Sequence, residues 1–159
     1  MVTVVPAGAS DVSDIHALIR ALADYERLAH HVVSTEDDIR RDLFGPRPYA
    51  EVILARSDEE TVAFALFFHN YSTFLGRPGI YLEDLFVLPE HRGQGIGRAL
   101  LAELARIAVE RRCGRLEWSV LDWNEPAVGF YRRMGADVMD EWRICRLTGE
   151  ALARIAAES

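Results

Sequence analysis

A glycine-rich heptapeptide between a strand pattern and a helix pattern is the feature that most constrains this fold. It reads Arg92-Gly93-Gln94-Gly95-Ile96-Gly97-Arg98, after the apolar run Ile80–Leu88 and before the amphipathic pattern Ala99–Arg112. With a further strand pattern at Arg115–Val120, this order predicts a βαβ unit with parallel strands and a right-handed crossover. Because such a turn presents consecutive backbone N–H groups at a helix N-terminus, it also predicts a phosphate site.

The remaining patterns place this unit in a larger sheet. Further strands are predicted at Val2–Val5, Val52–Arg56 and Thr61–Phe68, with one or two more in Val138–Leu147 and a loop at Tyr71–Gly79. Helices are expected to begin after residue types that cap N-termini, namely Ser10, Ser34 or Thr35, Asn124 and Thr148. We therefore expect an α/β fold with a central mixed, mostly antiparallel β-sheet, a parallel βαβ core and helices on both faces. One domain covering residues 1–159 is expected.

The charge composition narrows the classes of ligand. The net charge is −7, and all 18 basic residues are arginine. The chain therefore has no P-loop lysine and no lysine for a Schiff base, and its acidic balance argues against nucleic acid as a partner. A negative field favours a cationic substrate instead. No apolar run approaches the ~20 residues of a membrane helix, and two cysteines without CxxC spacing predict reduced thiols in a cytoplasmic protein.

Three phosphate motifs compete for the heptapeptide. A P-loop requires Gly-Lys-Ser/Thr, whereas Gly97 is followed by Arg98. A dinucleotide fingerprint requires G-x-G-x-x-G, whereas a single residue separates the last two glycines here. The third motif, R-x-x-G-x-G/A, matches at Arg92, Gly95 and Gly97 and is the pyrophosphate loop of the GCN5-related N-acetyltransferases (GNATs). A glycine turn without a ligand stays open as the alternative at this point.

The sequence resembles the GNAT superfamily over nearly its whole length, and most of all its diamine (spermidine/spermine) N-acetyltransferase branch. The segments that carry the resemblance include Leu22–Glu26, Tyr81–Val87, Trp123–Pro126, Phe130–Ala136 and Glu141–Arg143. The resemblance implies the GNAT fold, acetyl-CoA as cosubstrate, no metal, and a homodimer. It also implies transfer of the acetyl group to a primary amine of a small cationic substrate by direct attack on the thioester.

The donor site is expected in three parts of the chain. Backbone N–H groups from Gly93 to Arg98 would hold the pyrophosphate, with positive charge added by Arg92 and Arg98. The resemblance implies that Leu85, Phe86 and Val87 offer backbone groups to the pantetheine arm, and that Asn124 bonds the cofactor while capping its helix. It also implies that the central strand and the next strand splay apart to open the slot.

The acceptor chemistry needs a base and an acid. A primary amine has a pKa near ~10.4, so roughly one molecule in 2,500 is neutral at pH 7, and a nearby carboxylate must take the proton. The resemblance favours Glu83 as a water-linked base and Asp84 as a binding carboxylate; since adjacent strand residues alternate, we expect them on opposite faces. It implies Tyr131 as the acid that protonates the departing thiolate, and Tyr25 and Glu26 as contacts to the cationic substrate.

The identity of the amine stays open on the sequence. Arg27, beside the expected substrate contacts, would repel a second ammonium, which weakens the case for spermidine and spermine. A shorter diamine, thialysine or another lysine-like amino acid remains. Two further alternatives are a protein or peptide N-acetyltransferase on the same fold and a non-catalytic acyl-CoA-binding regulator. Retention of Glu83, Asn124 and Tyr131 argues against a regulator, because a binder needs neither acid nor base.

Overall fold

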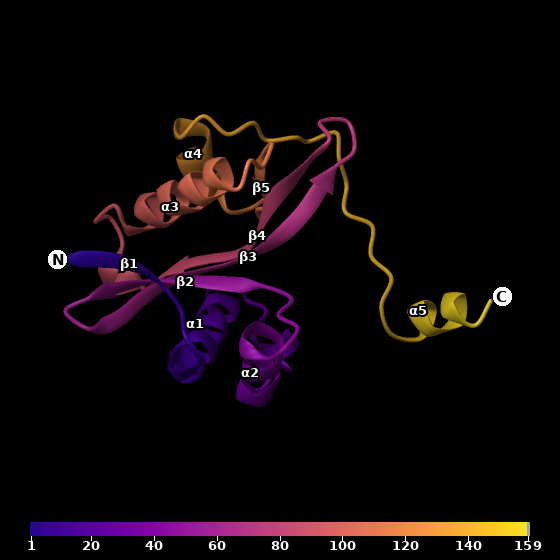
Figure 1. Cartoon of the computed structure of the whole chain (residues 1–159), viewed down its shortest axis with the longest axis horizontal. Helices are drawn as coiled ribbons and strands as arrows, with labels where there is room; N and C mark the ends of the chain where they lie inside the picture. Colours follow the sequence, from indigo (N-terminus) through magenta and orange to yellow (C-terminus); the bar gives the residue numbers. More distant parts are fainter. Residues whose placement is uncertain (159) are drawn as a thin grey trace. The chain divides into compact units, whose positions relative to one another are not determined.

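The computed structural model describes residues 1–158 of the chain (Figure 1). Two compact units are present, Met1–Ser119 and Val120–Ser159, and each is described by itself. The expectation of one domain over residues 1–159 stays a prediction.

The first unit contains a five-stranded sheet in the order β1-β2-β3-β4-β5. The strands are β1 (Val2–Pro6), β2 (Glu51–Ser57), β3 (Glu60–Ser72), β4 (Arg77–Val87) and β5 (Leu116–Trp118). The first four pair antiparallel, whereas β4 and β5 pair parallel. Because α3 (Ile96–Glu110) connects these two parallel strands, the βαβ unit predicted around the glycine-rich heptapeptide is confirmed.

Helices cover both faces of this sheet (Figure 1). α1 (Val12–Tyr25) and α2 (Glu36–Phe44) lie on one face, and α3 lies on the other. The cluster beneath α1 and α2 is built from buried apolar side chains of helices and strands: Val12, Ile15, Leu18, Ile39, Val52, Leu54, Phe64 and Phe86. On the α3 side the helix buries Ile96, Leu100, Leu101, Leu104 and Ile107. The expected mixed, mostly antiparallel α/β architecture is confirmed.

The starts of α1 and α2 show one wrong and one correct capping prediction. Ser10 does not cap α1, because a 3-10 turn, η1 (Ala9–Asp11), comes first. In that turn the Gly8 N–H donates to Asp11 Oδ2 over 2.8 Å. Thr35 caps α2 as expected: its Oγ1 accepts the Asp38 N–H over 3.2 Å, and Asp38 Oδ2 accepts the Thr35 N–H over 2.9 Å. This reciprocal pair is a capping box.

The predicted loop Tyr71–Gly79 is mostly strand. The β3–β4 ladder continues to the pair Ser72↔Arg77, so only residues 73–76 form the turn. The turn closes through the Leu75 N–H, which donates to Ser72 Oγ over 3.2 Å, and through Gly76, whose φ of 65° suits glycine. The sequence prediction made both strands too short, because Gly76, Pro78 and Gly79 are residue types typical of loops.

The second unit contains two helices, α4 (Glu125–Arg133) and α5 (Gly149–Ala156). Their N-caps are Asn124 and Thr148, as predicted. The prediction of strands in Val138–Leu147 is wrong. Residues 136–148 form neither helix nor strand, and their one regular feature is a turn at 140–141. A strand needs a partner for its backbone hydrogen bonds. The described part of this unit, residues 120–158, contains no strand that could act as that partner.

Two further 3-10 turns complete the first unit. η2 (Ala29–His31) follows α1, and η3 (Pro89–His91) follows β4. The second of these leads from the central strand into the glycine-rich heptapeptide, whose last three residues begin α3.

Candidate active site

A β-bulge interrupts β4 at Glu83. Along the β3–β4 ladder Leu66 pairs with Asp84, but the next residue, Phe67, pairs with Leu82. Glu83 is therefore the extra residue on its strand. A bulge breaks the strict two-residue alternation of side chains and re-aims the residues beside it.

The bulge brings both carboxylates to the α1 face of the sheet. Leu66 packs against the core cluster beneath α1 and α2, so Asp84, which lies opposite it, faces these helices. Leu82 faces α3, because its partner on β3 lines a pocket together with α3 residues. Alternation from Leu82 therefore places Glu83 on the α1 face as well. The expectation that Glu83 and Asp84 point to opposite faces is wrong. Adjacent residues alternate only in a regular strand, and the bulge interrupts that alternation between Leu82 and Asp84.

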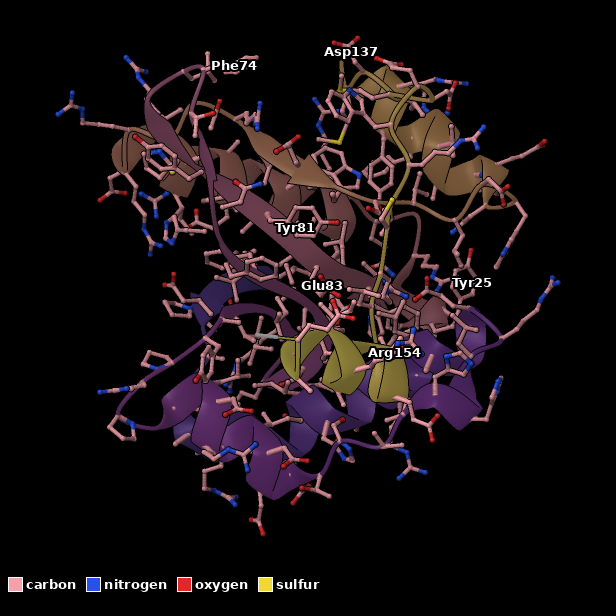
Figure 2. All side chains as sticks on the ribbon, turned by 90° about the vertical axis from the view of Figure 1, so that its right-hand side faces the viewer. Tyr25, Phe74, Tyr81, Glu83, Asp137 and Arg154 are labelled. Atoms are coloured by element: carbon pink, nitrogen blue, oxygen red, sulfur yellow. The ribbon has the colours of Figure 1, made fainter. Side chains whose placement is uncertain are left out.

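Glu26 joins these two residues to form an acidic cluster, defined as Glu26, Glu83 and Asp84. Asp84 is mostly buried, and burial raises its pKa to about 7, with the charges of Glu83 and Glu26 acting in the same direction. Burial also raises the pKa of Glu26. Figure 2 shows Glu83 on β4 and Tyr25, the neighbour of Glu26, at the end of α1. The cluster thus joins the central strand to the end of the first helix.

The end of α1 is fixed by a tight turn. Arg27 adopts a left-handed conformation, with φ of 62°, and the Leu28 N–H donates to the Ala23 carbonyl over 2.8 Å. This arrangement ends the helix at Tyr25, whose ring lies 6.2 Å from that of Phe86 on β4. The expected substrate contacts Tyr25 and Glu26 are therefore brought to the same region as the β4 carboxylates.

The glycine-rich heptapeptide forms a turn in which the first two of its three glycines have left-handed backbones. Gly93 has φ of 75°, and Gly95, the N-cap of α3, has φ of 80°. A Cβ added at either residue would meet no heavy atom within 4 Å, so the requirement there is conformational. Ile96 is buried and anchors the helix start, whereas Gln94 and Arg98 are exposed. An open turn at the start of a 15-residue helix fits a pyrophosphate.

The pairing of β4 with β5 ends early. Only Ile80, Tyr81 and Leu82 have parallel partners, at Leu116 to Trp118. The segment Leu85, Phe86 and Val87 continues along β4 beyond this last pair, and Phe86 points into the core. The β4–β5 ladder therefore ends before Leu85, and the expected divergence of the two strands stays a prediction.

A stacked arginine is the contact that sequence reasoning missed. The guanidinium carbon of Arg92 lies 4.6 Å from the centre of the Tyr25 ring and 5.2 Å from that of Phe86, and its Nε donates to the Val87 carbonyl over 3.0 Å. No sequence pattern links Arg92 to Tyr25, because they belong to segments that only the tertiary fold brings together.

Two candidate residues, Asn124 and Tyr131, belong to the second unit. Asn124 is buried, and its Oδ1 accepts the Ala127 N–H over 3.4 Å at the start of α4. Tyr131 lies within α4, partly buried, with its ring 5.5 Å from that of Phe130. The capping role of Asn124 is confirmed, and the roles of both residues toward acetyl-CoA stay predictions.

Residues 1–158 lack two features that other kinds of protein site require. No group of three or more His, Cys, Asp or Glu side chains in this part of the chain is placed to hold a metal ion. None of its helices combines the length and apolar character that crossing a membrane requires.

Comparison with known proteins places this site in a family. The model of the acetyltransferase (GNAT) family matches residues 15–136. The chain is 39% identical to the thialysine N-epsilon-acetyltransferase of Mus musculus over 158 residues, which covers 92% of each chain. It is 35% identical to the L-ornithine N5-acetyltransferase NATA1 of Arabidopsis thaliana, covering 92% of this chain and 84% of that protein. The structure of an integron cassette protein from the V. cholerae mobile metagenome superposes with a TM-score of 0.83 at 26% identity, covering 99% of this chain and 98% of that one. With its fold and glycine turn, the chain therefore belongs to the GNAT family and is an N-acetyltransferase that uses acetyl-CoA.

Proposed function

We propose that this enzyme acetylates the terminal primary amine of a small cationic substrate. The observation that carries the proposal is the acidic cluster, in which a bulge brings Glu83 and Asp84 to one face and Glu26, the residue after α1, joins them. Three carboxyl groups around one position attract an ammonium group and supply acceptors for its proton.

Within this class we propose a cationic amino acid, such as thialysine or ornithine, over the longer polyamines. Arg27 follows Glu26 directly and adds a positive charge beside the cluster. That charge opposes a second ammonium but complements the carboxylate of an amino acid. The names of the curated relatives, which include thialysine and L-ornithine acetyltransferases, support the same choice. A short diamine remains the second candidate within the class.

The donor-site roles are proposed on the geometry of the first unit. Backbone N–H groups from Gly93 to Arg98 would hold the pyrophosphate, since Gly93 and Gly95 adopt the backbone conformations that such a turn needs. Leu85, Phe86 and Val87 would hold the pantetheine amides through backbone groups, as an added strand does. Asn124 would add a hydrogen bond from the second unit.

The proposed chemistry moves one proton from the amine and one to the thiolate. Glu83, which is exposed, accepts the ammonium proton through a water molecule, while Asp84 binds the ammonium. The nitrogen then forms its bond to the acetyl carbon, and the carbon–sulfur bond breaks. Tyr131 donates its hydroxyl proton to the leaving sulfur, because a tyrosine hydroxyl is ordinarily protonated at pH 7.

An amine panel tests the proposed acceptor. Thialysine, ornithine, putrescine, spermidine and a peptide with a free N-terminus are each incubated with the enzyme and acetyl-CoA, and released thiol is measured. We expect the highest kcat/KM for the two amino acids, with putrescine next. Faster turnover of the peptide would move the enzyme to the protein-acetylating class, and no thiol release with any amine would reject the proposal.

Tyr131→Phe tests the proposed acid. Loss of the hydroxyl should lower kcat by about 100-fold while the affinity for coenzyme A changes less than about two-fold, since a general acid acts mainly in the transition state. Tyr71→Phe, at an exposed position on β3, is the matched control and should keep full activity. An unchanged kcat in Tyr131→Phe would remove this residue from the mechanism.

We further propose a homodimer located in the cytoplasm. Exposed apolar side chains on the second unit, among them Met139, Trp142 and Ile144, are of the kind that a partner chain covers. Two free cysteines are compatible with a reducing compartment. Light scattering across a concentration series tests the assembly, and a constant monomer mass would contradict it.

A further inference from the structure

Arg92 connects three segments of the first unit through its side chain. It follows η3 at the entrance of the glycine-rich turn, and its guanidinium stacks on Tyr25 of α1 and Phe86 of β4. Its Nε–H donates to the Val87 carbonyl at the end of β4, over 3.0 Å. The guanidinium is therefore held by two aromatic faces and a carbonyl oxygen from the same unit.

The position of this contact matters because Glu26 follows Tyr25 directly. The turn at Arg27 ends the helix at this point, and the Tyr25 ring adds a contact to β4 at the last residue of α1. The Tyr25 and Phe86 rings lie 6.2 Å apart at 49°, and the guanidinium lies within cation–π distance of both. The charge of Glu26 in turn acts on Asp84, so the end of α1 lies within electrostatic range of the β4 carboxylates.

We propose that the Arg92 side chain is a positioning residue of the amine site: it clamps the Tyr25–Glu26 end of α1 onto β4 and is not a ligand of the pyrophosphate. This inference rests on the proposed function, because it assigns the acidic cluster to the amine. The backbone of the glycine-rich turn keeps its role toward the donor, and Arg98, at the exposed start of α3, supplies the positive charge there. Arg92 therefore links the segment that holds the donor to the segment that holds the acceptor.

Arg92→Ala and Arg98→Ala form a matched pair that separates the two roles. For Arg92→Ala we expect the KM for the amine to rise by at least about two- to five-fold, the range that corresponds to one exposed cation–π contact, because the variant loses the contacts to both rings and the hydrogen bond to Val87. Its dissociation constant for coenzyme A, measured by calorimetry, should stay within two-fold of the wild type. Arg98→Ala should show the opposite pattern, with weaker coenzyme A binding and an unchanged KM for the amine.

Arg92→Lys provides a second variant in case the alanine protein does not fold. Lysine keeps the positive charge that a pyrophosphate needs, but it lacks the planar guanidinium and the Nε–H that bonds to Val87. We expect Arg92→Lys to raise the KM for the amine as Arg92→Ala does. Full rescue by lysine would overturn the inference, because it would show that only the charge matters.

Hydrogen exchange gives a readout that does not depend on turnover. In both Arg92 variants the amides of residues 22–28 should exchange faster than in the wild type, whereas those of α3 should not change. Weaker coenzyme A binding with unchanged exchange at 22–28 would overturn the inference, whatever the KM for the amine does. If the wild type acetylates no amine, the proposed function fails, and the exchange and coenzyme A measurements still decide the role of Arg92.

Discussion

At the scale of single residues, one extra residue on β4 sets the orientation of the two candidate carboxylates. Sequence reasoning selected Glu83 and Asp84 as carboxylates, but it assigned them to opposite faces because it assumed a regular strand. The bulge brings both to the face where α1 ends, and their proximity contributes to the raised pKa of Asp84. The identity of these residues could be predicted from a local motif. Their common orientation could not, because it depends on the register against β3.

Asp84→Asn should change how stability depends on pH. Since the pKa of folded Asp84 is raised to about 7, the folded state binds a proton that the unfolded state has already released above about pH 4. The stability contributed by this group is therefore fully present below about pH 4 and is lost as pH rises through 7. Between pH 5 and pH 8 we expect the asparagine variant to gain on the order of 2 kcal/mol relative to the wild type, measured by urea unfolding.

The control for this experiment is Glu83→Gln, at the exposed neighbouring position. Its unfolding free energy should follow the wild-type pH dependence more closely than that of Asp84→Asn. Parallel pH profiles for Asp84→Asn and the wild type would contradict the assignment of a raised pKa to this carboxyl group.

At the scale of elements, most helices and strands could be predicted because their apolar periodicity agrees with the packing that they adopt. β1, β2, α3 and α4 begin within a few residues of the expected positions. The errors occur where local residue types conflict with tertiary pairing. Gly76 and Pro78 indicated a loop, but ladder hydrogen bonds carry β3 and β4 to Ser72 and Arg77.

Thr35→Ala should destabilise the protein by about 1 kcal/mol, because it removes the side-chain half of the capping box of α2. The sequence left Ser34 and Thr35 as equal candidates for this cap. Ser34→Ala is therefore the matched control, with an expected change within about 0.5 kcal/mol. Urea unfolding of the two variants measures both values, and a larger loss for Ser34→Ala would contradict the cap assignment.

At the scale of the whole molecule, the chain divides into a unit built around a sheet and a unit built from two helices. The mixed sheet of the first unit could be predicted, because a parallel βαβ unit combined with an antiparallel hairpin allows few strand orders. The segment 138–147 was predicted to contain one or two strands, but a strand also needs a partner for its backbone hydrogen bonds, and the local sequence does not reveal whether one is present. Side chains such as Met139, Trp142 and Leu147 are exposed instead.

Hydrogen exchange on dilute protein should reveal this difference between the units. Amides of residues 137–147 should exchange within seconds, whereas those in the middle of α3 should be protected to near the global unfolding free energy. Mass spectrometry of peptic fragments measures both regions in one experiment. Slow exchange in 137–147 under these conditions would mean that the segment forms ladder hydrogen bonds after all.

The bulge at Glu83 also limits how far the thermal stability of this protein can be raised by engineering. Deleting the extra residue would restore an unbroken ladder between β3 and β4, which idealised strand geometry favours. The same deletion would remove one of the two adjacent carboxylates from β4 and, with it, part of the charge that is proposed to attract the acceptor. Thermostabilised descendants of this enzyme should therefore keep the irregular strand, since a regular one would exchange activity for stability.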